Sequence, residues 1–270
     1  MKKGRREMIK KFNISKILLS FFIILGLGYF VFSGIPVKKV YASGMFGLEV
    51  KGGAYFQNLS GHLAVGNGGT VITPSLLGLQ TTKTEPMLKV ALYLLYDNRI
   101  SFTYVPYLYS GSTTISQNVV YFNGQTYSIN TPVTSKLHLY SYKMFYDHNF
   151  EINRYASVGL GVGVDVITAK TELDSPYVSD TKNVSLPIPI IGGRIKITPI
   201  NDFSFIGKIQ GLSVGSGGYY YHINAGVNYK AVGPLSIFAD YIYDKVHVDT
   251  NNVDGTLEFD GPEAGVRLRF

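Results

Sequence analysis

The sequence predicts an all-β fold, a closed antiparallel transmembrane β-barrel of about ten strands that follows a signal peptide. Three observations lead to this prediction. Apolar and polar residues alternate with a period of two over most of the chain, the alternating segments are long, and the connections between them are alternately long and short. A barrel of about eight strands is the alternative.

The composition excludes several other classes of protein. The chain has 270 residues, of which 46% are hydrophobic and 16% are charged, and it contains 21 Tyr and 16 Phe but no Cys and no Trp. A disordered chain would have fewer aromatic residues and more charge. A chain without Cys cannot form a disulfide scaffold or a thiolate metal site. The length allows one large all-β domain.

The net charge of +7 is concentrated at the start of the chain. Residues 1–42 carry nine of the 25 Lys and Arg and a single acidic residue, Glu7, which leaves 16 basic and 17 acidic residues in the rest. A nucleic-acid-binding protein needs basic residues gathered on a folded face. We therefore expect no nucleic-acid partner.

The same first segment has the features of a secretory signal peptide. Basic residues, seven of them in the first sixteen, precede the apolar run Ile17–Phe32, and small residues follow at Ala42. This order matches the charged, apolar and cleavage regions of a signal peptide. An uncleaved membrane anchor is the alternative, although a spanning helix needs about 20 apolar residues. We predict a signal peptide over residues 1–42, a barrel domain over residues 43–270, and a start at Met1 or Met8.

The rest of the chain alternates in a way that suits strands in a bilayer. Successive side chains of a strand point to opposite faces. The final segment places Pro262, Ala264, Val266, Leu268 and Phe270 on one face and Glu263, Gly265, Arg267 and Arg269 on the other. Residues 46–57, 156–166 and 219–230 show the same pattern. We assign the apolar faces to lipid and the polar faces to the barrel interior.

The alternating segments define ten strands. We place them near residues 46–56, 84–96, 99–109, 134–146, 154–167, 185–198, 203–213, 218–230, 235–246 and 257–270. A tilted membrane strand needs about 9–11 residues, and strands of soluble domains are usually shorter. The connections 57–83, 110–133, 168–184, 214–217 and 247–256 alternate with short turns near 97–98, 147–153, 199–202 and 231–234. Outer-membrane barrels have this arrangement of external loops and periplasmic turns. A soluble lipocalin-like barrel is the alternative.

The end of the chain and two further segments resemble known outer-membrane proteins. Phe270, which closes an alternating strand, is similar to the C-terminal signal that the assembly machinery of Gram-negative bacteria recognises. The segments Leu257–Val266, Leu48–Phe56 and Leu186–Pro189 resemble a family of uncharacterised outer-membrane β-barrel proteins. The resemblance covers most of residues 45–270. It implies an outer-membrane barrel with Phe270 as its assembly signal, and it implies no activity.

The polar faces give an inventory of charged and polar side chains expected inside the barrel. These are Glu49, Lys51, Lys89, Lys143, Asp165, Arg194, Lys196, Lys208, His222, Asp240, Asp244, Glu263, Arg267 and Arg269. One interpretation is an interior plugged by salt bridges, because small barrels fill their interiors with side chains. The other is a narrow polar pore, which the glycines at 159, 161 and 163 favour by leaving one wall without side chains. If Lys208, Arg194 and Lys196 find no acids across the barrel, a cationic wall remains.

We expect no catalytic residues, no cofactor and no metal site. His247, Asp249, Asp244 and Asp240, with His62 in the first loop, come closest to a hydrolase constellation, but no G-x-S-x-G or H-E-x-x-H motif accompanies them. Asp249, Asn251, Asn252 and Asp254 could hold Ca²⁺ through oxygen ligands, but a polar hairpin tip has the same composition. Residues 57–82 carry no Asp, Glu, Lys or Arg. We expect this loop to pack on its neighbours, with the barrel mouth, the outer leaflet or an apolar ligand as alternatives.

The predicted function is that of a non-enzymatic outer-membrane barrel with a structural or surface-interaction role. A narrow channel for small polar or anionic solutes is the first alternative, and an outer-membrane enzyme is the second. The expected location is the outer membrane of a Gram-negative bacterium. The expected partners are membrane lipid and lipopolysaccharide, with periplasmic chaperones and the barrel-assembly machinery during export, and the expected state is a monomer.

Overall fold

The computed structural model describes residues 46–270 except 67, 96, 117–118, 214–216 and 251–252. The predicted signal peptide, residues 1–42, lies outside the described residues. Twelve strands are present: β1 (Phe46–Val65), β2 (Thr82–Leu94), β3 (Asn98–Thr114), β4 (Val120–Phe122), β5 (Gln125–Tyr127), β6 (Pro132–Asn153), β7 (Ala156–Asp174), β8 (Ser179–Ile200), β9 (Phe203–Ser213), β10 (Gly218–Val232), β11 (Leu235–Thr250) and β12 (Val253–Arg269). No helix among the described residues is long and apolar enough to cross a membrane.

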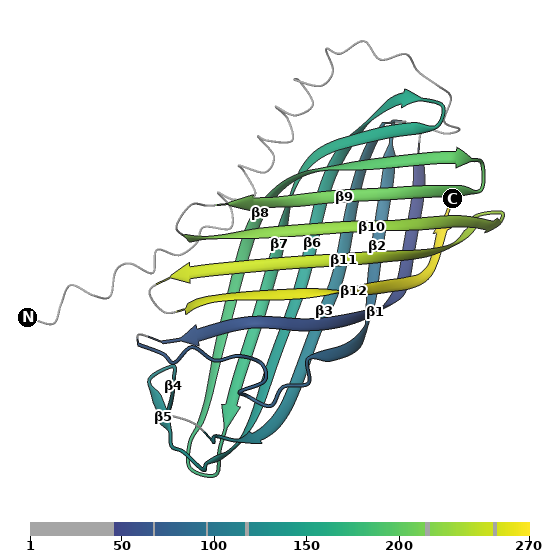
Figure 1. Ribbon diagram of the computed structural model, residues 1–270. Coiled ribbons are helices and arrows are strands. Elements are labelled where there is room, and N and C mark those ends of the chain that lie inside the picture. The colour runs from purple at the N-terminus through teal and green to yellow at the C-terminus, as the bar shows by residue number, and fades with distance from the viewer. Residues whose placement is uncertain (1–45, 67, 96, 117–118, 214–216, 251–252) are drawn as a thin grey trace, which may run out of the picture. The chain divides into compact units, whose positions relative to one another are not determined.

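Ten of these strands close into an antiparallel barrel. Their order is β1-β12-β11-β10-β9-β8-β7-β6-β3-β2, and β4 and β5 form a separate two-stranded hairpin. The hairpin lies at the end of the barrel remote from the C-terminus (Figure 1). The closed order leaves no unpaired edge, which a strand in hydrocarbon could not tolerate. The prediction of ten strands is confirmed, and the alternative of eight is wrong.

Several strands run further than predicted. β1 continues to Val65, so the first nine residues of the predicted loop 57–82, with His62 among them, are strand. β6 continues to Asn153 through the segment 147–153 that the sequence predicts as a turn. The connection between β7 and β8 shrinks to residues 175–178. The extra length lies largely at the loop end, where the strands keep pairing beyond the span that lipid requires.

At the short-turn end of the strands, the side chains that point outward and inward are those that the sequence predicts. Phe46, Leu160 and Ile209 lie on the outer surface and are exposed. Glu49 and Asp165, which belong to the opposite faces of their strands, are buried inside the barrel. An apolar outer belt around a polar interior is the arrangement that a bilayer requires of spanning strands.

Toward the loop end the apolar residues change sides. In β6, Leu137 and Leu139 are 4% exposed and face inward, while Lys136 and His138 between them face outward. A few residues later Tyr142 and its apolar neighbours face outward. β1 and β12 change in the same way, and Leu59 pairs with Phe259 at this level. The prediction that apolar faces contact lipid along whole strands is therefore wrong for the loop half, which buries its apolar residues as a soluble domain does.

The interior of the loop half is a packed apolar core. Its members include Tyr55, Leu59, Val65, Tyr107, Tyr109, Leu137, Leu139, Leu173, Leu257 and Phe259. The uncharged segment after β1 contributes Ile72, Leu77 and Leu79, and Ile72 exchanges backbone hydrogen bonds of 2.8 and 2.9 Å with Leu63. The β4–β5 hairpin contributes Val120, Phe122 and Tyr127. The loop thus packs on its neighbours, as expected.

The glycines of β7 do not leave free space in the wall. A Cβ atom built on Gly161 would lie 2.0 Å from the carbonyl oxygen of Tyr146, and one on Gly163 would lie 2.3 Å from that of Met144. Glycine here lets β6 and β7 approach closely, which no other residue allows at such distances. The expectation of free space beside these glycines is therefore wrong for Gly161 and Gly163.

Candidate functional site: the charged cavity of the barrel

A cavity lies inside the barrel at the level of the apolar outer belt. Tyr93 and Arg267 line it near the short-turn end, and Tyr107 and Ile242 line it where the apolar core begins. Its volume is about 70 Å³, which is room for about five waters at the ~10–15 Å³ that each needs. The barrel interior is therefore neither fully packed nor a wide aqueous channel.

The structure brings most of the predicted interior residues to this cavity. Eleven of the fourteen line it: Glu49, Lys51, Lys89, Lys143, Arg194, Lys196, Lys208, His222, Asp240, Asp244 and Arg267. Asp165 and Glu263 are fully buried behind lining cations that they bind. Arg269 lies at the rim, where its guanidinium covers the ring of Tyr93 at 4.1 Å.

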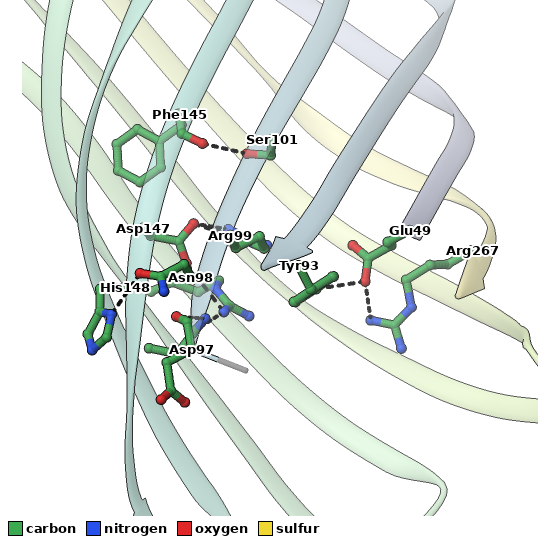
Figure 2. Close-up of polar contacts among 12 residues, drawn as sticks. Glu49, Tyr93, Asp97, Asn98, Arg99, Ser101, Phe145, Asp147, His148 and Arg267 are labelled. Carbon is green, nitrogen blue, oxygen red and sulfur yellow. Dashed lines mark hydrogen bonds and ion pairs between the residues drawn. The ribbon is translucent and has the colours of Figure 1, made fainter. Parts of the chain in front are cut away.

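Glu49 is the acceptor at the short-turn end of the cavity. The hydroxyl of Tyr93 donates to its carboxylate at 3.0 Å, and Arg267 lies 3.8 Å from the same oxygen. Figure 2 shows both side chains reaching Glu49 from different strands. One layer deeper, Lys51 binds Asp240 at 2.5 Å and Glu263 at 3.2 Å. These contacts cross-link four strands, β1, β2, β11 and β12.

A second cluster surrounds Asp244 at the boundary with the apolar core. Its carboxylate accepts hydrogen bonds from Tyr220 at 2.8 Å and Tyr107 at 3.0 Å, and it lies 2.8 Å from Nδ1 of His222. Lys143 donates to the hydroxyl of Tyr220 at 2.7 Å and lies 3.6 Å from Asp165. Most polar groups of this cluster bind one another, whereas Nε2 of His222 and Oδ2 of Asp165 are buried without a hydrogen-bond partner in the described structure.

Arg99 and Asp147 also belong to the site, although they are not among the interior residues predicted from the sequence. Both are buried inside the barrel, and Arg99 donates to one oxygen of Asp147 from Nε at 2.9 Å and from Nη2 at 2.7 Å (Figure 2). The other oxygen of Asp147 lies 3.5 Å from Arg194. Arg99 adjoins the predicted turn 97–98, and Asp147 is the first residue of the predicted turn 147–153. Arg99 lies two residues before Ser101, so both side chains point to the same, inward face of β3. This alternation is the signal from which the inward position of Arg99 could have been predicted.

Three cations in the cavity wall have no partner. Within the described part of the chain, Lys89, Lys196 and Lys208 form no ion pair and no hydrogen bond. Lys89 comes from β2, Lys196 from β8 and Lys208 from β9. Of the three cations for which the sequence left the pairing open, Arg194 forms an ion pair with Asp147. Lys196 and Lys208 reach no acid in the described part of the chain.

The possible hydrolase residues are not brought together. Asp240 and Asp244 face the cavity, whereas His247 contacts Tyr219 and Thr256 on the outer surface of the neighbouring strands. His62 is in β1, opposite Thr256. Among the residues that the structure describes, no three His, Asp or Glu side chains form a group that could hold a metal ion. Asn251 and Asn252 of the possible Ca²⁺ ligands lie outside them.

A closed antiparallel barrel of ten strands with an apolar outer belt and charged interior residues defines a transmembrane β-barrel of the bacterial outer-membrane type. Solved structures agree. The outer-membrane protease OmpT of Escherichia coli is similar with a TM-score of 0.53 and 11% identity, covering 86% of this chain and 99% of its own. The comparison with protein-family models found no match, and neither did the comparison with curated proteins.

Two further barrels are similar at lower scores. One is Ail, the attachment invasion locus protein of Yersinia pestis, with a TM-score of 0.38 and 12% identity, covering 84% of this chain and 100% of its own. The other is Neisserial surface protein A, with a TM-score of 0.35 and 11% identity, covering 85% of this chain and 100% of its own. The likeness to OmpT establishes the fold, and at 11% identity it establishes nothing about activity.

Proposed function

We propose that this protein is a non-porous outer-membrane barrel with a structural or surface-interaction role and without enzymatic activity. The observation that carries the proposal is the apolar core of the loop half, where Tyr107 and Phe259 meet with ring centroids 4.3 Å apart. Packed aromatic and aliphatic side chains exclude water. A solute that entered from the short-turn end would meet this core before reaching the outside.

The loop end offers a surface for interaction. Four large side chains of this end are exposed, and Tyr177 is 85% exposed. Tyr121 belongs to the β4–β5 hairpin, and the other three, Val71, Ile129 and Tyr177, lie in three different connections. Exposed apolar side chains gathered at one end of a protein mark contact surfaces more often than scattered ones do. The β4–β5 hairpin and its flanking connections are therefore the part of the chain that we assign to partner contact.

Other features fit the remaining parts of the proposal. The separation of His247 from Asp240 and Asp244 supports a non-enzymatic role, because a general base must lie within hydrogen-bond reach of its proton. The outer apolar belt suits membrane lipid and lipopolysaccharide. Phe270 is 67% exposed on this belt while its backbone bonds to Leu48, so its ring is accessible to chaperones and the assembly machinery.

Planar-bilayer recording tests the proposal. The purified protein is expected to show no discrete conductance steps under conditions in which a general porin conducts. The double variant Tyr107→Ala with Phe259→Ala removes the central aromatic pair of the core and is expected to let ions leak through. Stable openings of the unmodified protein would overturn the proposal.

A narrow anion channel is the second candidate, and one observation favours it. Lys89, Lys196 and Lys208 line the cavity from three strands without acidic partners in the described chain. A conducting pore lined in this way would prefer anions. In the same recordings, openings whose anion preference falls in Lys208→Glu would support this candidate over the non-porous barrel.

A further inference from the structure

We propose that the barrel cavity is a binding site for a small oxyanion, inorganic phosphate or sulfate, which enters from the short-turn end. This goes beyond the proposed structural role, because a closed barrel needs no ligand.

The charge of the cavity wall is positive. Eight Lys or Arg residues line it, against three Asp or Glu residues: Lys51, Lys89, Arg99, Lys143, Arg194, Lys196, Lys208 and Arg267 against Glu49, Asp240 and Asp244. Asp147, Asp165 and Glu263 bind lining cations from behind and bring the acids to six. An excess of two positive charges remains. Clefts lined by one sign of charge focus the field and concentrate the opposite ion.

The excess is carried by side chains that have no acceptor. Lys89 of β2 and Lys208 of β9 line the same cavity. Charged groups removed from bulk water are stable when they are paired, and a lysine ammonium has three N–H donors and no acceptor. An anion in the cavity would provide Lys89 and Lys208 with the partner that the described residues do not.

Two arginines also have a buried nitrogen atom that needs a hydrogen-bond acceptor. Nε of Arg194 and Nε of Arg267 are buried and have no hydrogen-bond partner in the described structure. An arginine Nε–H can only donate, so each of these groups needs an acceptor. Both side chains line the cavity. An oxyanion in the cavity would supply the acceptor that each of these two donors needs.

The size of the cavity limits the ligand. A space for about five waters accepts a tetrahedral oxyanion, whose oxygen atoms are each about the size of a water, together with some of its hydration. A nucleotide or a lipid headgroup with its glycerol would not fit in 70 Å³. The ligand class is thus a free inorganic ion.

The position of the cavity determines the side of entry. Lys196 pairs with Ile206 close to the turn that joins β8 to β9, and Arg267 pairs with Ser236 close to the start of β11. The cavity therefore reaches the short-turn end, whereas the apolar core covers its other end. In an outer-membrane barrel the short turns face the periplasm, so the ion would come from there.

Isothermal titration of the folded protein in non-ionic detergent tests the site. Sodium sulfate and sodium phosphate are titrated at constant ionic strength in sodium chloride. We expect saturable binding of one ion per chain by the unmodified protein and at least tenfold weaker binding by the double variant Lys89→Gln with Lys208→Gln. Lys245→Gln is the matched control, because Lys245 pairs with Glu258 on the outer surface.

The outcomes separate this proposal from the proposed function. Retained binding by Lys245→Gln with loss in the double variant supports the site. Absence of saturable binding by a heat-modifiable, folded preparation would overturn it, and so would a double variant that binds as tightly as the unmodified protein. If the double variant does not fold, Lys196→Gln at the rim is measured instead and is expected to weaken binding severalfold. Conductance in bilayers tests whether the barrel is closed. Its result does not change how the binding measurements are interpreted.

Discussion

Arg99 and Asp147 stand directly opposite each other on β3 and β6, and Arg99 places two of its donors on a single carboxylate oxygen, at 2.9 and 2.7 Å. The second oxygen stays available to Arg194 on β8. One buried carboxylate therefore links strands on both sides of β7 across the short-turn end of the barrel. This ion pair is the most completely buried one in the described interior, with side-chain exposures of 3% and 1%.

Removing the carboxylate charge should destabilise the barrel strongly. Asp147→Asn leaves two buried guanidinium groups without their counter-charge, and breaking a buried pair from one side costs about 3–5 kcal/mol. Urea unfolding in lipid vesicles, followed by heat-modifiable mobility, measures the change. Lys245→Gln, which breaks an exposed pair with Glu258, should leave the unfolding midpoint unchanged. Equal effects of the two variants would contradict the structure.

The change of sides along β6 predicts unequal costs for the same substitution. Leu137 is 4% exposed inside the loop half, so Leu137→Ala should cost about 2–5 kcal/mol through a residual cavity. Leu92 is 47% exposed on the outer belt, where lipid fills the space that a lost side chain leaves. Leu92→Ala should therefore cost much less in the same vesicles. A larger effect at Leu92 would mean that apolar faces contact lipid along the whole strand.

Arginine substitutions on the outer surface should locate the bilayer. Leu160→Arg on the belt should cost about 2–4 kcal/mol if it lies near the midplane. Thr181 also faces outward, but it lies in the loop half opposite Glu172. Thr181→Arg should leave stability unchanged, because it places a cation in water beside an acid. Comparable losses at both positions would place the loop half inside the membrane.

Two glycines should respond differently to a methyl group. In Gly161→Ala the new Cβ would lie 2.0 Å from the carbonyl oxygen of Tyr146, so β6 and β7 must move apart. Overpacking of this kind costs about 1–3 kcal/mol. In Gly52→Ala the nearest atom is the carbonyl oxygen of Met87 at 4.0 Å, and stability should not fall. Unfolding midpoints of the two variants in one detergent decide the comparison.

The number and pairing of the strands could be predicted because period-two alternation and turn residues are local signals. Ten strands follow from them, and so does the inward position of residues such as Glu49 and Lys51. Which acid binds which base could not be predicted. The pairing of Lys51 with Asp240 joins residues 189 positions apart, and it depends on the barrel's closure and register.

The change of sides has a signal in the sequence. In residues 133–146 the apolar residues Val133, Leu137 and Leu139 hold odd positions, whereas from Tyr142 onward even positions are apolar as well (Tyr142, Met144 and Tyr146, beside Phe145), with no turn between them. Alternation alone identifies a strand and not its environment. Only a change of parity within one uninterrupted strand indicates that the surroundings change from water to lipid, and Leu257–Val266 contains the same change.

The level at which the apolar residues change sides also fixes the depth of the barrel in the bilayer. If the barrel slid outward, belt residues such as Phe56 would leave hydrocarbon for water. If it sank, the charged outer residues Lys136 and Glu172, which bind each other at 2.9 Å, would be drawn into hydrocarbon. Both displacements raise the free energy, and they do so on every side of the barrel. The protein therefore holds its loop end at a set height above the membrane surface, and the β4–β5 hairpin is presented to the outside at that height.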